Sequence, residues 1–129
     1  MVQLFESLSD EDLAELTKSG KFMEFPAGTE VTTQGRGGIG FHLILDGRAI
    51  VTSGEVEKAT LGPGKYFGEM SLLDNEGRST TVTAATDLRT FTLASWDFMA
   101  TLATDFNIAR KILAGLSRRI RQLEGDAAP

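Results

Sequence analysis

The stretch that decides the fold is Phe67-Gly68-Glu69-Met70-Ser71-Leu72-Leu73, followed after a short acidic turn by Gly77-Arg78-Ser79-Thr80-Thr81. Gly68 has no Cβ, so a ligand can approach the backbone closely at this position. We expect the amides of residues 70–72 in the first turn of a short helix, where unpaired N–H groups favour an anion. The stretch therefore predicts a compact anion pocket.

Two charged side chains, nine positions apart in the sequence, indicate which anion would fit. The planar guanidinium of Arg78 can hold two phosphate oxygens, and Ser79 and Thr80 add hydroxyl and amide donors beside it. Glu69 is an acceptor among these donors, and its carboxylate would repel a bare phosphate. The pair therefore indicates a ligand that also carries a sugar hydroxyl.

At these residues the chain resembles the cyclic nucleotide-binding domains, a family that includes the regulatory subunits of protein kinase A, the catabolite-activator regulators and the cyclic-nucleotide-gated channels. The phosphate-binding cassette of the family runs Phe-Gly-Glu, a few small or apolar residues, a variable loop, and then Arg followed by Ser, Thr or Ala and an apolar strand. The resemblance covers roughly Leu4 to Glu124. It implies that the ligand is bound by Phe67, Gly68, Glu69, Met70, Ser71, Arg78, Ser79 and Thr80.

The resemblance also implies a role for each part of the cassette. Arg78 would pair with the cyclic phosphate, and Ser79 with the amides of residues 70–71 would complete the cradle. Glu69 and the backbone of Gly68 would hold the ribose 2′-hydroxyl. The base would lie against apolar side chains and be covered by the last helix, where the candidate caps are Ile112, Leu116 and Arg119.

The function implied is a sensor domain for a cyclic nucleotide, with cAMP favoured over cGMP, that signals through its C-terminal helix. Ser79 could also serve a guanine amino group, so the sequence leaves cGMP open. The alternative is the same fold used as a nucleotide-free protein-interaction module, with Glu69 and Arg78 in a structural ion pair. Members of the family that bind no ligand usually lack one of these two residue types, and this chain has both.

The composition of the chain excludes several other classes of function. The chain has 129 residues, no cysteine and a net charge of −5, which fits one cytoplasmic domain and makes direct binding to nucleic acid a poor expectation. No apolar run reaches the ~18 residues of a membrane span, and the N-terminus does not read as a signal peptide. We expect no enzyme, metal or cofactor, because metal-dependent phosphodiesterases need clusters of His and Asp, and the chain has one histidine. The effector stays open, as does whether the domain is freestanding or cut from a longer chain.

That histidine, His42, lies in a β-rich run, where we expect a hydrogen-bonded strand residue rather than a metal ligand. Asp74 and Glu76 fall in a turn rich in polar residues, where carboxylates are usually solvated, so they do not indicate acid–base catalysis.

The order of the elements predicts a mainly β fold, a double-stranded β-helix or jelly roll with an N-terminal helix, the cassette helix and two C-terminal helices. Ser9 is the expected cap of the first helix. Asp46-Gly47 between two β-rich runs predicts a hairpin. The expected strands are residues 22–25, 30–33, 41–45, 48–52, 58–61, 80–85 and 88–93, and the expected late helices are 96–103, capped by Ser95, and 105–124.

These elements are expected to form one domain over residues 1–124, with the β-roll at about 20–94, the C-terminal helices at about 95–124 and a flexible tail at 125–129.

The last helix carries an apolar seam with alternating spacings of three and four residues, formed by Phe106, Ala109, Leu113, Leu116, Ile120 and Leu123. Such a heptad pattern suits either a face buried on the roll or a parallel homodimer, and the sequence leaves both open. The basic residues of the same helix, Arg110, Lys111, Arg118, Arg119 and Arg121, suit either a solvated face or contact with a ligand or partner.

Overall fold

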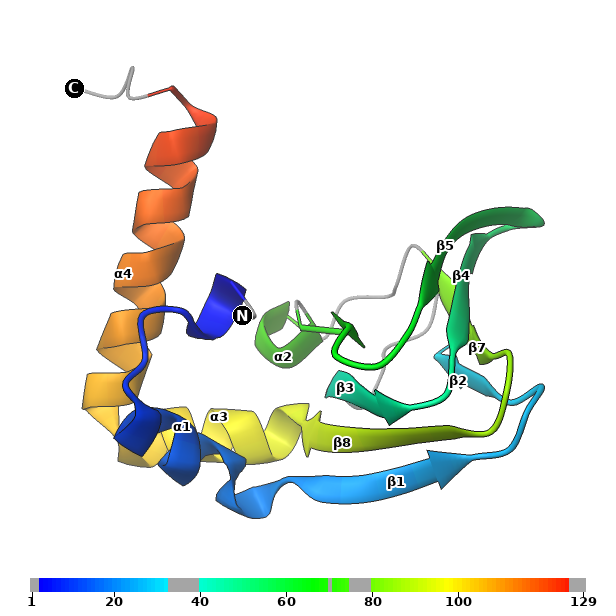
Figure 1. Cartoon of the computed structure of the whole chain (residues 1–129). Coiled ribbons are helices and arrows are strands. Elements are labelled where there is room, and N and C mark those ends of the chain that lie inside the picture. The colour runs from blue at the N-terminus through cyan, green and yellow to red at the C-terminus, as the bar shows by residue number, and fades with distance from the viewer. Residues whose placement is uncertain (1–2, 33–39, 70, 75–79, 126–129) are drawn as a thin grey trace. The chain divides into compact units, whose positions relative to one another are not determined.

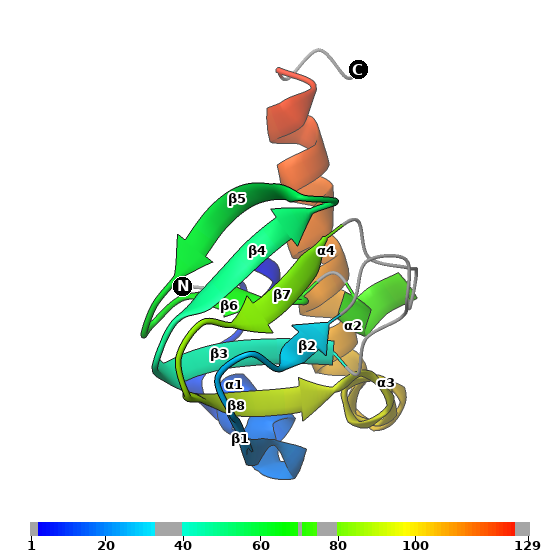
Figure 2. The same ribbon diagram turned by 90° about the vertical axis from the view of Figure 1, so that its right-hand side faces the viewer.

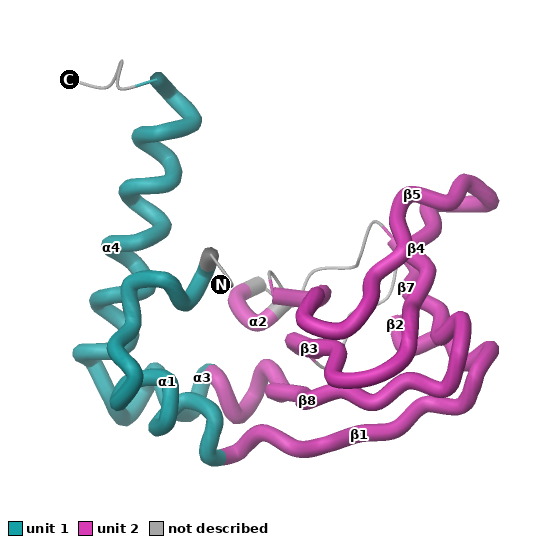
Figure 3. Tube along the Cα trace, in the orientation of Figure 1, with its two compact units in different colours: residues 1–18, 99–129 teal, residues 19–98 magenta. Residues whose placement is uncertain are grey.

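A computed structural model describes residues 3–32, 40–69, 71–74 and 80–125 (Figure 1). The chain divides into two compact units (Figure 3), one formed by residues 1–18 and 99–129 and the other by residues 19–98. The second unit contains the described strands and the cassette, and the first contains the N-terminal segment and the last helix.

The second unit is a roll of two antiparallel four-stranded sheets (Figure 2). The strands are β1 (Lys21–Phe25), β2 (Glu30–Thr32), β3 (Gly40–Asp46), β4 (Ala49–Ser53), β5 (Val56–Leu61), β6 (Tyr66–Phe67), β7 (Thr81–Ala84) and β8 (Leu88–Ala94). One sheet has the order β1-β8-β3-β6 and the other β2-β7-β4-β5. The predicted jelly-roll class is confirmed.

The core of the roll comes from side chains that alternate along the strands. In β7, for example, Val82 and Ala84 are buried while Thr81 and Thr83 are half-buried. Full burial of an aliphatic or aromatic side chain contributes about 1.5–3 kcal/mol, so this alternation fixes which face of each strand points inward. The buried cluster comprises Ile44, Ala49, Phe67, Val82, Ala84 and Leu88.

The predicted hairpin at Asp46-Gly47 is wrong in its pairing. The strands on either side of this turn, β3 and β4, belong to different sheets, and β4 pairs instead with β5. Ile44 before the turn and Ala49 after it are both fully buried. The chain therefore crosses from one layer to the other here, because burial of side chains on both sides outweighs the local hairpin preference of Asp-Gly.

The turn at Gly47 is a corner that packs against a second corner, between β7 and β8. Gly47 has a φ of 88°, and a Cβ there would lie only 2.2 Å from the carbonyl oxygen of Asp87. The N–H of Arg48 donates to Oγ1 of Thr86 at 3.0 Å. Glycine is therefore needed both for its backbone conformation and for the close approach of the two corners.

The helices of the described chain are α1 (Asp10–Leu16), α2 (Ser71–Asp74), α3 (Ser95–Thr104) and α4 (Phe106–Leu123), with single 3₁₀ turns η1 (Gln3–Phe5) and η2 (Thr17–Ser19). Ser9 caps α1 as predicted, in a capping box whose Oγ accepts the N–H of Asp12 and whose backbone N–H donates to the Asp12 carboxylate, both at 3.1 Å. Ser95 is the first residue of α3 rather than its cap, and Asp105 caps α4.

The N-terminal segment is bound to one face of α4 within the first unit. Lys111 Nζ lies 2.6 Å from Oδ2 of Asp12, and Arg118 donates to Oγ of Ser7. Gly115 lies between these two contacts, and a Cβ there would be 2.8 Å from Oγ of Ser7. Two of the basic residues noted in the sequence are thus used inside the chain.

The predicted seam lies on the other side of α4 and is largely uncovered. Phe106, Leu113, Ile120 and Leu123 are 74%, 63%, 56% and 77% exposed. The buried apolar side chains of the helix are instead Ile108 and Ile112. Within the first unit, the N-terminal segment therefore leaves these four side chains uncovered.

The Asp12–Lys111 pair predicts an acid-sensitive contribution to stability. The hydrogen bond from Lys111, supported by the one from the Ser9 backbone, lowers the pKa of Asp12 from its ordinary value of 3.8. A carboxyl group with a lowered folded pKa stabilises the fold above its unfolded pKa, and this contribution is lost as the pH falls through the folded pKa.

We therefore expect Asp12→Asn to lower the melting temperature at neutral pH, with a difference from wild type that shrinks as the pH falls below 3.8. Differential scanning calorimetry from neutral pH to below 3.8 measures the two melting temperatures. The control is Glu15→Gln, also on α1, which removes an exposed ion pair with Lys18 of η2 and should cost at most about 0.5 kcal/mol. A difference between wild type and Asp12→Asn that did not change with pH would contradict this role.

Candidate functional site

The described part of the cassette begins at the end of a short edge strand. Phe67 is the last residue of β6 and is buried. Gly68 follows with a φ of 83°, a left-handed conformation that favours glycine. The chain then turns through Glu69, which is half-buried, to Ser71, the first residue of α2. On the far side of the cassette, the half-buried Thr80 leads directly into β7.

Three predicted site residues, Met70, Arg78 and Ser79, lie outside the described residues. The convergence of Arg78 and Glu69 on one ligand therefore stays a prediction. What the structure does describe is how the two ends of the cassette are held.

Leu72 anchors the cassette helix. Its side chain is 1% exposed, and its N–H donates to the carbonyl of Glu69 at 3.2 Å. A Cβ on Gly40 would lie 3.1 Å from the Leu72 side chain and only 2.3 Å from the carbonyl oxygen of Leu93. Gly40 also has a φ of 143°, so a glycine at the start of β3 leaves the room in which Leu72 packs.

A chain of buried polar side chains lies behind Phe67. His42 on β3 is 1% exposed, and its Nδ1 is 3.0 Å from Oγ1 of Thr92. Oγ1 of Thr92 lies 2.9 Å from Oγ1 of Thr90. The prediction of a hydrogen-bonded strand histidine is confirmed. The sequence analysis missed the two threonines, although their alternate positions on a strand place them on one face.

The imidazole also contacts two aromatic rings. It stacks on Phe67 with a centroid distance of 4.8 Å and an interplanar angle of 17°, and Phe25 meets it edge-on at 6.0 Å. Within the described ranges, His, Asp and Glu form no group of three that could hold a metal ion.

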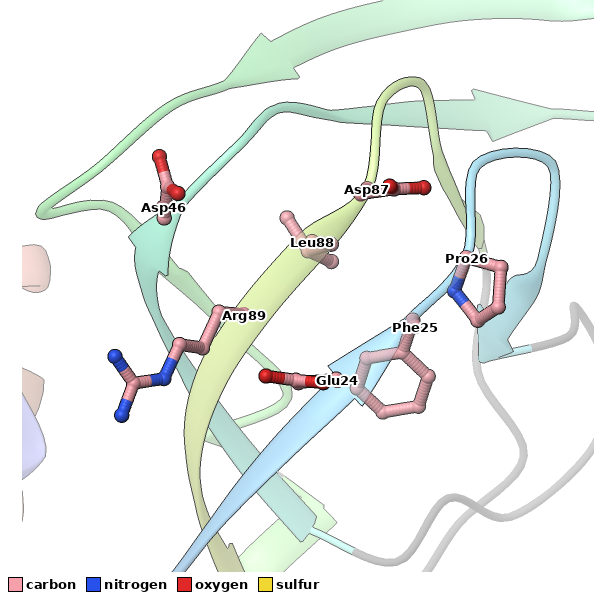
Figure 4. Close-up of a pocket in the computed structure, with 7 residues that line it drawn as sticks. All are labelled: Glu24, Phe25, Pro26, Asp46, Asp87, Leu88 and Arg89. Carbon is pink, nitrogen blue, oxygen red and sulfur yellow. The ribbon is translucent and has the colours of Figure 1, made fainter.

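A hollow elsewhere on the roll, of about 470 Å³, contains none of the predicted site residues (Figure 4). Oδ1 of Asp87 accepts the N–H of Ala27, and Oδ1 of Asp46 accepts the N–H of Gly47. The Arg89 guanidinium lies over the ring of Phe22, 5.2 Å from its centre. Most of its charged groups thus already have structural partners. Its lining is Glu24, Phe25, Pro26, Asp46, Asp87, Leu88 and Arg89.

The family profile named "Cyclic nucleotide-binding domain" matches residues 22–105, more than half of the chain. The chain belongs to this family. The matched range contains the whole cassette, including both Glu69 and Arg78. Among its described residues, no helix is long and apolar enough to cross a bilayer.

Two curated relatives show the breadth of the family. A cyclic nucleotide-gated potassium channel from Mesorhizobium japonicum is 35% identical over 84% of this chain and 30% of its own length. The cyclic AMP receptor protein of Thermus thermophilus is 31% identical over 94% of this chain and 58% of its own length. The chain thus spans less than two thirds of either relative.

A solved structure gives the same fold. The N-terminal domain of a transcriptional regulator from Streptomyces coelicolor A3(2) superposes with a TM-score of 0.82 at 27% identity. The alignment covers 98% of this chain and 91% of that domain. The two chains therefore share one fold.

Proposed function

We propose that the chain is a sensor domain that binds a cyclic mononucleotide through its cassette, with cAMP preferred to cGMP. The observation that carries the proposal is the presence of both Glu69 and Arg78 within a sequence that belongs to the family. A nucleotide-free interaction module would need neither an acceptor nor a bidentate phosphate donor at these positions. Binding rather than catalysis is the proposed activity.

In this proposal the two ends of the cassette bind different parts of the ligand. Arg78 binds the cyclic phosphate, with Ser79, Thr80 and the amides of residues 70–71 completing the cradle. Glu69 accepts the ribose 2′-hydroxyl beside the backbone of Gly68. Gly68, which precedes Glu69, has a left-handed backbone conformation that favours glycine. This conformation supports the close approach of the ligand.

The preference for cAMP is supported by the relative from Thermus thermophilus, which is named for cyclic AMP. For the cap over the base, α4 offers Leu116, which is half-buried, and Arg119, which is exposed. Ile112 is the weakest of the three candidates, because its side chain is only 2% exposed.

Arg78→Ala is expected to abolish cAMP binding measured by calorimetry while circular dichroism still shows a folded chain. A micromolar affinity corresponds to about 8 kcal/mol, and each charge-assisted hydrogen bond contributes about 1.5–3 kcal/mol. Loss of a bidentate contact would thus weaken binding by roughly a hundredfold or more.

The matched control is Arg89→Ala, which removes an exposed arginine from the hollow of Figure 4 and should leave cAMP binding unchanged. Glu69→Ala should weaken ribose-containing ligands but not a simple phosphate analogue. Unchanged cAMP binding by Arg78→Ala would show that the pocket is assigned wrongly, and a wild-type chain that bound neither nucleotide would favour the interaction module.

We also propose that the ligand signals through α4. The cassette belongs to one compact unit, and α4 with the N-terminal segment belongs to the other. A ligand shifts such an arrangement only by its different affinity for two states, so the proposal requires that α4 changes when the cassette closes. The amide protection of α4 is the observable that reports it.

The uncovered seam of α4 supports pairing with a second copy of the chain. Its four exposed apolar side chains recur at heptad spacing on the side of the helix that does not bind the N-terminal segment. Two such seams would bury each other in a parallel dimer.

Sedimentation velocity at micromolar concentrations should therefore show a dimer for wild type and a monomer for the double variant Leu113→Lys, Ile120→Lys. Gln122→Lys, which adds one positive charge at an exposed position off the seam, should remain dimeric. A wild-type chain that sedimented only as a monomer, with and without cAMP, would rule the dimer out.

A further inference from the structure

The strand that leads into the cassette has little to hold it in place. β6 is two residues long and lies at the edge of its sheet, where its strand neighbour is β3. Its register on β3 consists of the pairs His42 with Phe67 and Leu43 with Tyr66. The backbone before it is tied to the same strand, since the N–H of Ile44 donates to the carbonyl of Lys65 at 2.9 Å.

The direction in which the chain enters the cassette therefore depends on how the Phe67 side chain packs. Phe67 is 7% exposed, and its ring lies almost flat on the imidazole of His42, directly opposite in the register. The next two residues are Gly68 and Glu69. Because they follow Phe67 directly, a shift of the Phe67 backbone would also move Gly68 and Glu69.

The imidazole is itself fixed. Its Nδ1 is joined to Oγ1 of Thr92, which is joined in turn to Oγ1 of Thr90, and both threonines are almost fully buried. A buried polar group that lost such a partner would not find water in its place, so these contacts restrict the orientation of the imidazole. A phenylalanine at position 42 would keep the stacking on Phe67 but lose the hydrogen bond to Thr92. An asparagine would keep a hydrogen-bonding group but lose the stacking.

We propose that His42 is a positioning residue for the ribose-binding end of the cassette. It holds the plane of the Phe67 ring through the bond to Thr92 and thereby sets the direction in which Glu69 leaves β6. These groups all belong to the second unit, so the inference depends on the geometry of the roll alone. It rests on the proposed function, because Glu69 is the proposed acceptor for the 2′-hydroxyl.

The test compares the affinities for cAMP and 2′-deoxy-cAMP by calorimetry. Wild type should prefer cAMP by about tenfold or more, the loss expected for one hydrogen bond to a charged group. His42→Phe, His42→Asn and Thr92→Val should each lower this ratio to about threefold or less, with a smaller change in affinity for the deoxy ligand. A merely structural role would lower both affinities equally and leave the ratio unchanged.

The matched control is Ile44→Val, which removes one methylene from the same strand and the same core and should keep the ratio of wild type. Thr92→Val preserves the shape of the side chain and decides the question alone if the His42 variants do not fold. A wild-type preference that persists in Thr92→Val overturns the role of His42 while leaving the sensor proposal intact. A wild-type chain that binds neither nucleotide overturns the sensor proposal, and the role of His42 with it.

Discussion

Pairing of β6 with β3 is the constraint on which the candidate site depends. β6 has two residues, and the chain leaves the sheet at Gly68 immediately after them. On the other side of the cassette, Leu72 packs beside Gly40 at the first residue of β3. One strand thus supports both the entry to the cassette and its helix, so the position of Glu69 is fixed by the roll rather than by the cassette sequence itself.

The helix α4 has two faces with different roles. One face binds the N-terminal segment through Lys111, Gly115 and Arg118, so the two ends of the first unit are held together by an ion pair, a close glycine contact and a hydrogen bond. The other face presents apolar side chains to solvent. Under the proposed function, such a helix would report a change at the cassette to a second copy of the chain while it keeps the N-terminal segment bound.

The sequence was a good guide where a local signal carries its own physics. Ser9 reads as a cap because its hydroxyl can accept an amide three residues later, and the structure shows that bond. It was a poor guide where distant residues decide. Asp46-Gly47 specifies a tight turn but not the partner strand, which depends on burial of Ile44 and Ala49 in a common core.

The same distinction holds at the site. The cassette could be recognised because its residues are close in sequence, whereas the stack of Phe67 on His42 joins positions that only the strand register brings together. The contact between Asp12 and Lys111 could not be predicted either, because a carboxylate and an ammonium so far apart in sequence have many other partners available. The apolar seam of α4 was visible as a pattern, but the binding of the N-terminal segment to the opposite face was not.

Hydrogen exchange measured by mass spectrometry, with and without saturating cAMP, tests the central claim most directly. The sensor account predicts slower exchange in peptides covering residues 67–80 when cAMP is bound, together with altered exchange along α4. Identical exchange over residues 67–80 in both states, or protection confined to the hollow of Figure 4, would contradict it.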